Sequence, residues 1–408
     1  RKLDNGLTVV MRENHSLPLV SISTATLGGP RYETPEDAGI TSLMASMLSR
    51  GAASRTREQI ASSVDRAGGS LEPYSGRNSF GVNASFMAED LPLALGLVAD
   101  VWLRPTFPED ELTAQKRLAL AGIQARGDSV ESFAFEALLG DLYTAHPYGR
   151  MPGGTVESVE GLTREDLADF HRRFATVNGS VLTVCGDVDA EDVIARVAEL
   201  MRTAPAHAQE PPTPPVEPPI EQRRERTIAR SQGQAIVAYG FHGLSVTDPD
   251  QPALDVLDAA FSGVGFPGGR LHDTLRGQQL VYFAHAMPIG GVDPGPFVIY
   301  AGTQADKVKV VRSEIERLVA EVVSEPISDE ELARAQAMCI SSELVGLQTN
   351  GALAQTMALD TLYGLGANRW EGYAARIEAV TASDVLAVAK RVLDLNRSVV
   401  VVTTPEAE

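Results

Sequence analysis

The stretch VEGLTREDLADFHRRFATVNGSVLTV, residues 159–184, returns without a gap as IEAVTASDVLAVAKRVLDLNRSVVVV, residues 377–402. Thr163 aligns with Thr381, and in both copies an aspartate follows three positions later. This pairing is typical of a capping box at the start of a helix. Each copy then runs through an asparagine turn into apolar, largely β-branched residues that predict a strand. The chain is therefore predicted to contain a duplicated unit.

A second pair of stretches supports the duplication, because EDELTAQKRLALAGI at 109–123 matches DEELARAQAMCISSE at 329–343. The composition changes in PPTPPVEPP, residues 211–219, where six of nine residues are proline. Such a run favours extended polyproline II and acts as a semi-rigid spacer. The sequence thus predicts an N-terminal lobe, a proline-rich linker and a homologous C-terminal lobe, at residues 1–206, 207–219 and 220–408.

Local patterns in the first lobe predict both helices and strands. Thr34 as N-cap, Pro35 at the first position and Gly51 beyond the end predict one helix. Thr56 and Gln59 form a further capping box. Alternating apolar residues predict strands near residues 4–28 and at 79–87, and SVLTVCGDVD predicts another at 180–189. Helical patterns cover residues 91–103, 109–126, 131–145 and 190–202. Grouped strands with packed helices indicate α+β architecture with mixed or antiparallel sheets.

Composition and charge restrict the function. The 408 residues carry a net charge of −19, which argues against nucleic-acid binding because phosphate contacts need clustered Lys and Arg. No long apolar run predicts a membrane span. Cys185 and Cys339 lie in separate apolar stretches, and buried free thiols are expected. The compartment is left open: we expect a soluble protein, periplasmic if a leader was removed before Arg1.

The segment FSGVGFPGGRLHDTLRGQQLVY, residues 261–282, combines a glycine-rich loop, a short helix and a strand. Arg276 is expected to close the helix, and Tyr282 to lie in the strand. The sequence lacks a Walker lysine, a G-x-S-x-G elbow and a dinucleotide fingerprint. Its seven histidines include no pair at helical i, i+4 spacing, and His146 in HPYG is interpreted as structural.

Taken together, several stretches resemble the pitrilysin/insulinase superfamily of inverted-motif zinc peptidases, in particular its two-subunit bacterial, mitochondrial-processing-peptidase-like branch. The resembling stretches are DNGLTVV, AGITSLMASMLSRG, HPYGRMPGGTVESVEGLT, Gly186-Asp187 and GGRLHDTLRGQQLVY. The resemblance implies two homologous α+β lobes around a peptide chamber. Active members carry H-x-x-E-H on the first helix of the first lobe and a further glutamate ligand downstream.

This chain departs from the family pattern at the positions of the zinc ligands and of the general base. Counting back from Gly51, the two histidine positions fall on Ser42 and Ser46, the general base on Ala45 and the third ligand on Gly122. A neutral serine hydroxyl is a poor zinc ligand, and alanine cannot accept a proton from water. We therefore expect no metal in this chain and no peptidase activity from the chain alone.

The resemblance also implies that Arg276 and Tyr282 contact the substrate carbonyl and the developing oxyanion. It suggests a non-catalytic subunit of a heterodimeric zinc peptidase, with zinc on a homologous H-x-x-E-H partner and peptides or unfolded polypeptides as substrates. The glycines of the loop are candidates for contact with extended substrate: Gly263, Gly265, Gly268 and Gly269. Two alternatives remain, a purely structural core-protein-like subunit and a stand-alone peptide-binding clamp. For the two residues themselves, the structural alternative is that Arg276 complements the helix dipole and that Tyr282 is a half-buried strand residue.

Overall fold

The computed structural model describes residues 1–202, 204, 212–231, 233–264 and 268–406. These residues form two compact units, each assembled from separate parts of the sequence. Unit 1 contains Arg1–Ile123, Met151–Pro214 and Gly346–Trp370. Unit 2 contains Gln124–Arg150, Pro215–Val345 and Glu371–Glu408.

Unit 1 is built on a five-stranded mixed sheet in the order β1-β7-β2-β6-β5. The central strands alternate small and apolar residues, so they pack on both faces. Only the pairing of β1 with β7 is parallel. The strands are β1 (Thr8–Glu13), β2 (Leu19–Leu27), β5 (Ser70–Ser75), β6 (Ser79–Met87) and β7 (Val181–Gly186), with a small separate hairpin of β3 (Gly51–Ala52) and β4 (Arg55–Thr56).

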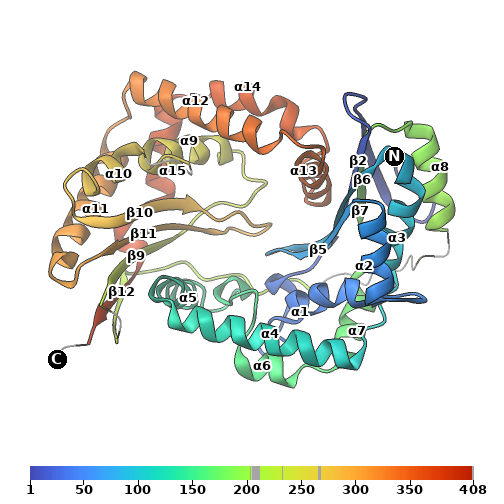
Figure 1. The fold of residues 1–408 in the computed structure, drawn as a ribbon. Coiled ribbons are helices and arrows are strands. Elements are labelled where there is room, and N and C mark those ends of the chain that lie inside the picture. Colours follow the sequence, from blue (N-terminus) through green and yellow to red (C-terminus); the bar gives the residue numbers. More distant parts are fainter. Residues whose placement is uncertain (203, 205–211, 232, 265–267, 407–408) are drawn as a thin grey trace. The chain divides into compact units, whose positions relative to one another are not determined.

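Helices cover both faces of this sheet (Figure 1). The fully buried Trp102 anchors α3 beneath it, donating its indole N–H to Thr26 Oγ1 at 3.1 Å. The helices of the unit are α1 (Ile40–Met47), α2 (Arg57–Arg66), α3 (Leu91–Leu103), α6 (Val156–Gly161), α7 (Arg164–Phe174), α8 (Ala190–Leu200) and α13 (Asn350–Leu362); α4 (Glu109–Asp128) begins here and ends in the other unit's part of the sequence.

Unit 2 repeats the same plan in its sheet, ordered β10-β11-β9-β12-β8. The strands of the two sheets can be matched in chain order: β8 with β1, β9 with β2, β10 with β5, β11 with β6 and β12 with β7. In this match the strand order agrees, and each pairing is parallel or antiparallel in both units alike. The strands are β8 (Arg224–Arg230), β9 (Ala235–His242), β10 (Val281–Pro288), β11 (Pro296–Thr303) and β12 (Val399–Pro405). The helices are α5 (Val130–Leu142), α9 (Gln251–Ser262), α10 (Gly269–Leu275), α11 (Val308–Ser324), α12 (Asp329–Gly346), α14 (Tyr373–Glu378) and α15 (Ala382–Val392).

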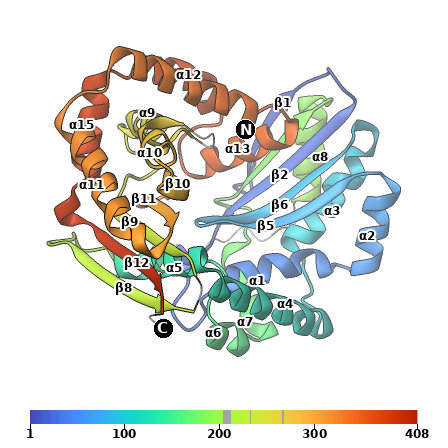
Figure 2. The ribbon, with the colours of Figure 1, turned by 60° about the vertical axis from the view of Figure 1, so that its left-hand side comes forward.

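The two sequence halves exchange one helix each. Helix α13, from the second half, packs on β2 and β7 of unit 1, where Leu353 and Met357 are buried. Helix α5, from the first half, packs on β9 and β12 of unit 2, where Leu138 and Leu142 are buried (Figure 2). Each sheet thus depends on a helix from the other half of the sequence to cover one of its faces.

The α+β prediction and the duplication are confirmed. Thr163 and Thr381 each accept a hydrogen bond from an aspartate N–H at 3.2 Å and begin helices of equal length, α7 and α15. The box at Thr56 is also confirmed as the start of α2. Of the predicted linker, residues 207–211 lie outside the described residues, and residues 212–219 form no helix or strand. The division into an N-terminal lobe at 1–206 and a C-terminal lobe at 220–408 stays a prediction.

The helix predicted to start at Pro35 is wrong in its first turn. Thr34 and Asp37 do bond to each other, but they close a single turn, because Gly39 adopts a left-handed conformation with φ 89°. Helix α1 therefore begins at Ile40. Its first N–H groups are capped by the buried Glu33 carboxylate, which accepts from Gly39 N at 2.8 Å and from Thr41 N at 3.1 Å.

No helix in the described part of the chain combines the length and apolar content that crossing a bilayer requires.

Candidate functional site

The glycine-rich loop joins α9 to α10 in unit 2. Gly263 ends α9 in the left-handed conformation, with φ 87°, and its N–H closes the last turn. Gly269 has φ 74°, and a Cβ there would lie 2.7 Å from the Phe261 carbonyl carbon. Both positions therefore require glycine for the fold itself. Gly268 is extended, and Gly265 lies outside the described residues. Substrate contact by these four glycines stays a prediction.

Arg276 follows the last residue of α10, as the sequence predicts, and Tyr282 is the second residue of β10. The Arg276 Nη1 donates to the backbone carbonyls of Val281 and Tyr282. This pair of bonds fixes the guanidinium against the start of the strand. The other guanidinium nitrogens form no hydrogen bond with described residues, so they can still donate.

The Tyr282 side chain projects outward from the strand and is 52% exposed. Its hydroxyl has no hydrogen-bond partner among the described residues, so it is available as a donor to a ligand. An exposure of about half also fits the alternative of a half-buried strand residue, so the role of Tyr282 stays a prediction.

Arg276 and Tyr282 line the same hollow, of about 370 Å³. Lys307 lies there too and donates from Nζ to the Gln279 carbonyl at 3.1 Å. Gln279 holds an uncommon left-handed backbone conformation, φ 57°, which turns the chain from α10 into β10. Two cations thus meet in one hollow of a chain whose net charge is −19.

The hollow lies at the start of a free sheet edge. Strand β10 is the last strand of its sheet, and its only ionisable side chains are Tyr282 and His285. The opposite edge strand, β8, carries four charged side chains in seven residues. Charged side chains protect a sheet edge against pairing with further strands. The edge at β10 lacks such charged side chains, and two of its backbone carbonyls, those of Tyr282 and Ala286, accept hydrogen bonds from the Arg276 and Ser262 side chains.

The four positions of the zinc motif do not fit a metal. Ser42 Oγ donates to the Pro152 carbonyl at 2.8 Å, and Ser46 Oγ donates to the Leu43 carbonyl at 2.7 Å. Ala45 is buried, and Gly122 is exposed on α4 with open space around it. These residues offer no imidazole or carboxylate, so no reaction step is assigned to zinc in this chain. Among the described residues, no three His, Cys, Asp or Glu side chains cluster suitably for a metal.

The buried His146 has protein partners at both ring nitrogens. Nδ1 accepts from Tyr148 N at 3.1 Å, and Nε2 lies 3.1 Å from the Asp293 carboxylate. Its structural interpretation is confirmed. Both cysteines are free and buried, as predicted, and burial raises the pKa of Cys185 to about 11 and that of Cys339 to about 12.

Sequence reasoning missed the contributions of Lys307 and Gln279 to the hollow. Lys307 ends a 3-10 turn, Ala305–Lys307, that follows β11, and the pairing of β10 with β11 brings it close. No local motif marks it. Gln279 itself is neither glycine nor asparagine, the usual residues at a left-handed position, and the glycine of this turn, Gly277, stands two residues earlier.

Comparison with known proteins identifies the family and the fold of this chain. Residues 8–155 match the model of the insulinase family (peptidase family M16), and residues 161–339 match that of the peptidase M16 inactive domain. An uncharacterized zinc protease of Streptomyces coelicolor is 28% identical over 98% of this chain and 88% of its own length. A probable mitochondrial-processing peptidase subunit beta of Arabidopsis thaliana is 25% identical over 95% of this chain and 75% of its own length.

Among solved structures, a peptidase M16 inactive domain from Pseudomonas fluorescens superimposes with a TM-score of 0.92 at 22% identity. The match covers 100% of this chain and 98% of that one, and it shows the shared fold. With two family models matched in order and the duplicated α+β fold in place, this chain belongs to the insulinase-type M16 peptidase family.

Proposed function

We propose that this chain is the non-catalytic, substrate-binding subunit of a heterodimeric zinc metallopeptidase that cleaves peptides or unfolded polypeptides. A homologous partner carries H-x-x-E-H and the zinc ion. This chain supplies Arg276 and Tyr282 to the substrate beside that metal. The observation that carries the proposal is that these two side chains meet at one exposed hollow, in a chain whose own zinc positions hold no ligand.

The division of roles is chemically coherent. A guanidinium held at one nitrogen by strand carbonyls keeps its remaining N–H groups for a substrate carbonyl, and such charge-assisted bonds are the stronger ones. The free Tyr282 hydroxyl can donate to an oxyanion as charge develops. Neither group hydrolyses a peptide bond without a metal-activated water, so we expect no activity from the chain alone.

The unprotected edge of β10 offers a way to hold the substrate. An extended peptide that adds to this edge pairs its backbone with the strand that carries Tyr282. Main-chain pairing of this kind tolerates many sequences, which suits a peptidase for unfolded polypeptides.

A structural subunit is the competing function, and it has support of its own. Arg276 already bonds two backbone carbonyls within its unit, so the guanidinium could serve only to join α10 to β10. In that case its removal would lower stability and leave the activity of the assembly unchanged. A stand-alone peptide clamp would instead work without any zinc-containing partner, so adding this chain to an H-x-x-E-H peptidase would leave the activity of that peptidase unchanged.

Reconstitution with the H-x-x-E-H partner separates these functions. We expect Arg276→Ala to lower kcat/KM of the complex on an unfolded peptide by at least about tenfold, from the loss of one charged hydrogen bond. We expect Tyr282→Phe to lower kcat with little change in KM, because the hydroxyl is engaged only as charge develops.

Arg334→Ala is the matched control, since Arg334 is an exposed arginine of α12 that lies outside the hollow around Arg276. The melting temperature of each variant is measured alongside. Unchanged kinetics with a lowered melting temperature would assign Arg276 to structure and would contradict the proposal.

A further inference from the structure

A second hollow, of about 530 Å³, lies at the other end of β10 in unit 2. Residues 285–288 of β10 form one wall. Helix α9 contributes Asp255, Asp258 and Ser262, and α12 contributes Ser342 and Glu343. This hollow shares no lining residue with the one around Arg276 and Tyr282.

The most buried acid of this hollow is Asp258, whose residue is only 7% exposed. The Ser262 hydroxyl donates to Asp258 Oδ1 at 2.8 Å. The second carboxylate oxygen accepts no hydrogen bond from any described residue. Burial is the main cause that raises the pKa of Asp258 to about 7, the nearby Asp255 adds to it, and the hydrogen bond from Ser262 offsets only part of the shift.

The remaining polar groups add negative charge. Asp255 accepts from the Tyr373 hydroxyl at 3.3 Å, and Glu343 is the third carboxyl of the lining. Among the described residues no Lys or Arg lines the hollow, and its one basic group is the exposed His285. A buried carboxyl with an unused oxygen, facing a space without a cation, is complementary to a positively charged ligand.

We propose that this hollow binds the positively charged side chain of a polypeptide that lies along β10. The inference rests on the proposed function, because β10 is the free edge at which the peptide would pair. The wall formed by residues 285–288 belongs to that edge, so a side chain of the added strand can enter between α9 and α12. Asp258 would then accept a charge-assisted hydrogen bond from an ammonium or guanidinium group.

The two ends of β10 differ in charge, which sets where the cation would bind. Arg276 and Lys307 stand at the start of the strand, and Asp255, Asp258 and Glu343 stand at its end. A basic side chain is therefore favoured at the end and disfavoured at the start. A metal ion is a poorer candidate, because the described residues include no set of three His, Cys, Asp or Glu ligands.

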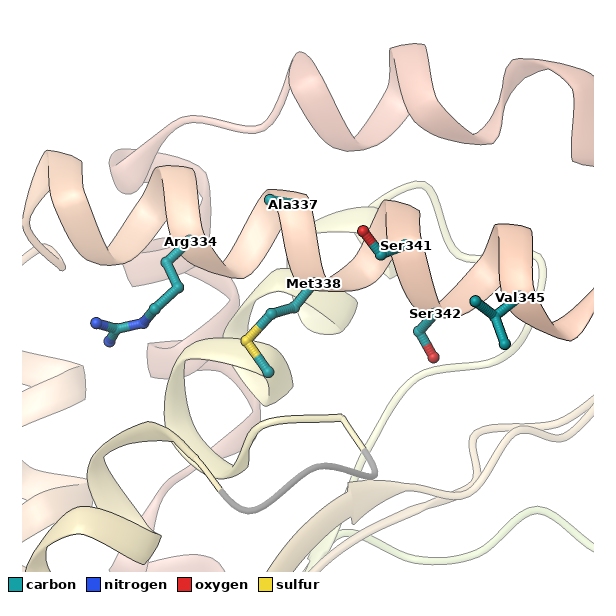
Figure 3. Close-up of a pocket in the computed structure, with 6 residues that line it drawn as sticks. All are labelled: Arg334, Ala337, Met338, Ser341, Ser342 and Val345. Atoms are coloured by element: carbon teal, nitrogen blue, oxygen red, sulfur yellow. The ribbon is translucent and has the colours of Figure 1, made fainter.

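A neighbouring hollow on α12, of about 360 Å³, offers no comparable group (Figure 3). Its described lining comes from α12 alone, and its charged member is Arg334. It lacks a buried acceptor, and its cation would repel a basic side chain.

The test uses the full chain and fluorescently labelled, extended peptides that are identical except at one central residue, which is Lys, norleucine, Arg or citrulline. We expect the Lys and Arg peptides to bind wild type roughly tenfold more tightly than their neutral counterparts, as one charge-assisted hydrogen bond would give. In Asp258→Asn this preference should fall to about twofold or less, while the norleucine peptide keeps its affinity.

Two further variants complete the test. Glu325→Gln removes one exposed carboxyl outside the hollow and should keep the full preference. Ser342→Lys places an ammonium within the hollow from the half-buried face of α12, and it should abolish the preference even if Asp258→Asn folds poorly. Equal binding of charged and neutral peptides by wild type would overturn this inference alone, since peptide binding itself would stand. No binding of any peptide would overturn the proposed function as well.

Discussion

The two units share one strand order, but the helix that follows the second strand of each sheet differs in what it presents. In unit 1 this helix is α1, whose Ser42 hydroxyl bonds to a carbonyl of its own unit and whose Ala45 is buried. In unit 2 it is α9, whose Asp255 and Asp258 face a hollow beside the free edge of β10. A duplicated backbone has kept its topology while its two copies diverged in side-chain chemistry. Function therefore has to be argued from each site separately.

The largest effect is expected from dividing the chain between its sequence halves. Residues 1–206 lack α13, and residues 220–408 lack α5, so each half leaves one sheet face uncovered. Losing a single buried leucine costs about 2–5 kcal/mol, and each exchanged helix buries several apolar side chains. We expect neither half alone to unfold cooperatively in thermal melts followed by circular dichroism, and co-expression to restore the transition. A cooperative melt from one half by itself would show that the exchanged helix is dispensable.

The next effect compares the buried acid of unit 2 with an exposed one. The folded-state pKa of Asp258, about 7, lies above its usual 3.8, so the folded protein binds the extra proton between these values. The contribution of Asp258 to the free energy of unfolding is fully present below about pH 4 and is lost as the pH rises to about 7. We expect Asp258→Asn to flatten the dependence of the unfolding free energy on pH in this window, by at most about 4 kcal/mol. Denaturant melts at several pH values measure this dependence. The unfolding free energy of Glu325→Gln should follow the same dependence on pH as that of wild type. The same dependence in Asp258→Asn would contradict the raised pKa of Asp258.

The smallest effect tests how closely the two copies still agree. Thr163 and Thr381 make the same capping bonds, with hydroxyl-to-carboxylate distances of 2.6 Å in both. Each change to alanine should lower the unfolding free energy by about 1 kcal/mol. The double variant should show the sum, because distant sites are additive. Clearly unequal losses would mean that the two helices contribute differently despite their matched caps.

Local features of the fold could be predicted from the sequence, and non-local ones could not. The capping boxes at Thr163 and Thr381 depend on residues three positions apart, and the helices begin where predicted. The start of α1 depends instead on the Glu33 carboxylate and on the backbone conformation of Gly39, which no capping pattern reveals. The edge strand β5 was missed because its sequence, SLEPYS, contains Pro73, which is unfavourable within a strand. The exchange of α5 and α13 depends on tertiary packing alone.

The candidate site shows the same limit. Arg276 and Tyr282 could be placed because each lies in a recognisable local element, the end of a helix and the start of a strand. Lys307 reaches the same hollow only through the pairing of β10 with β11. Asp258 and Ser342 come together from helices far apart in the sequence. Only the folded structure shows that these two residues line the same hollow.

The central claim is that catalytic zinc and the Arg276/Tyr282 pair reside on different chains. Metal analysis and peptide cleavage, measured on this chain alone, on the H-x-x-E-H partner alone and on their complex, test it most directly. The account predicts little zinc and no cleavage for this chain, and cleavage by the complex that exceeds that of the partner alone. Zinc near one ion per chain in the isolated protein, or a partner that is equally active by itself, would contradict it.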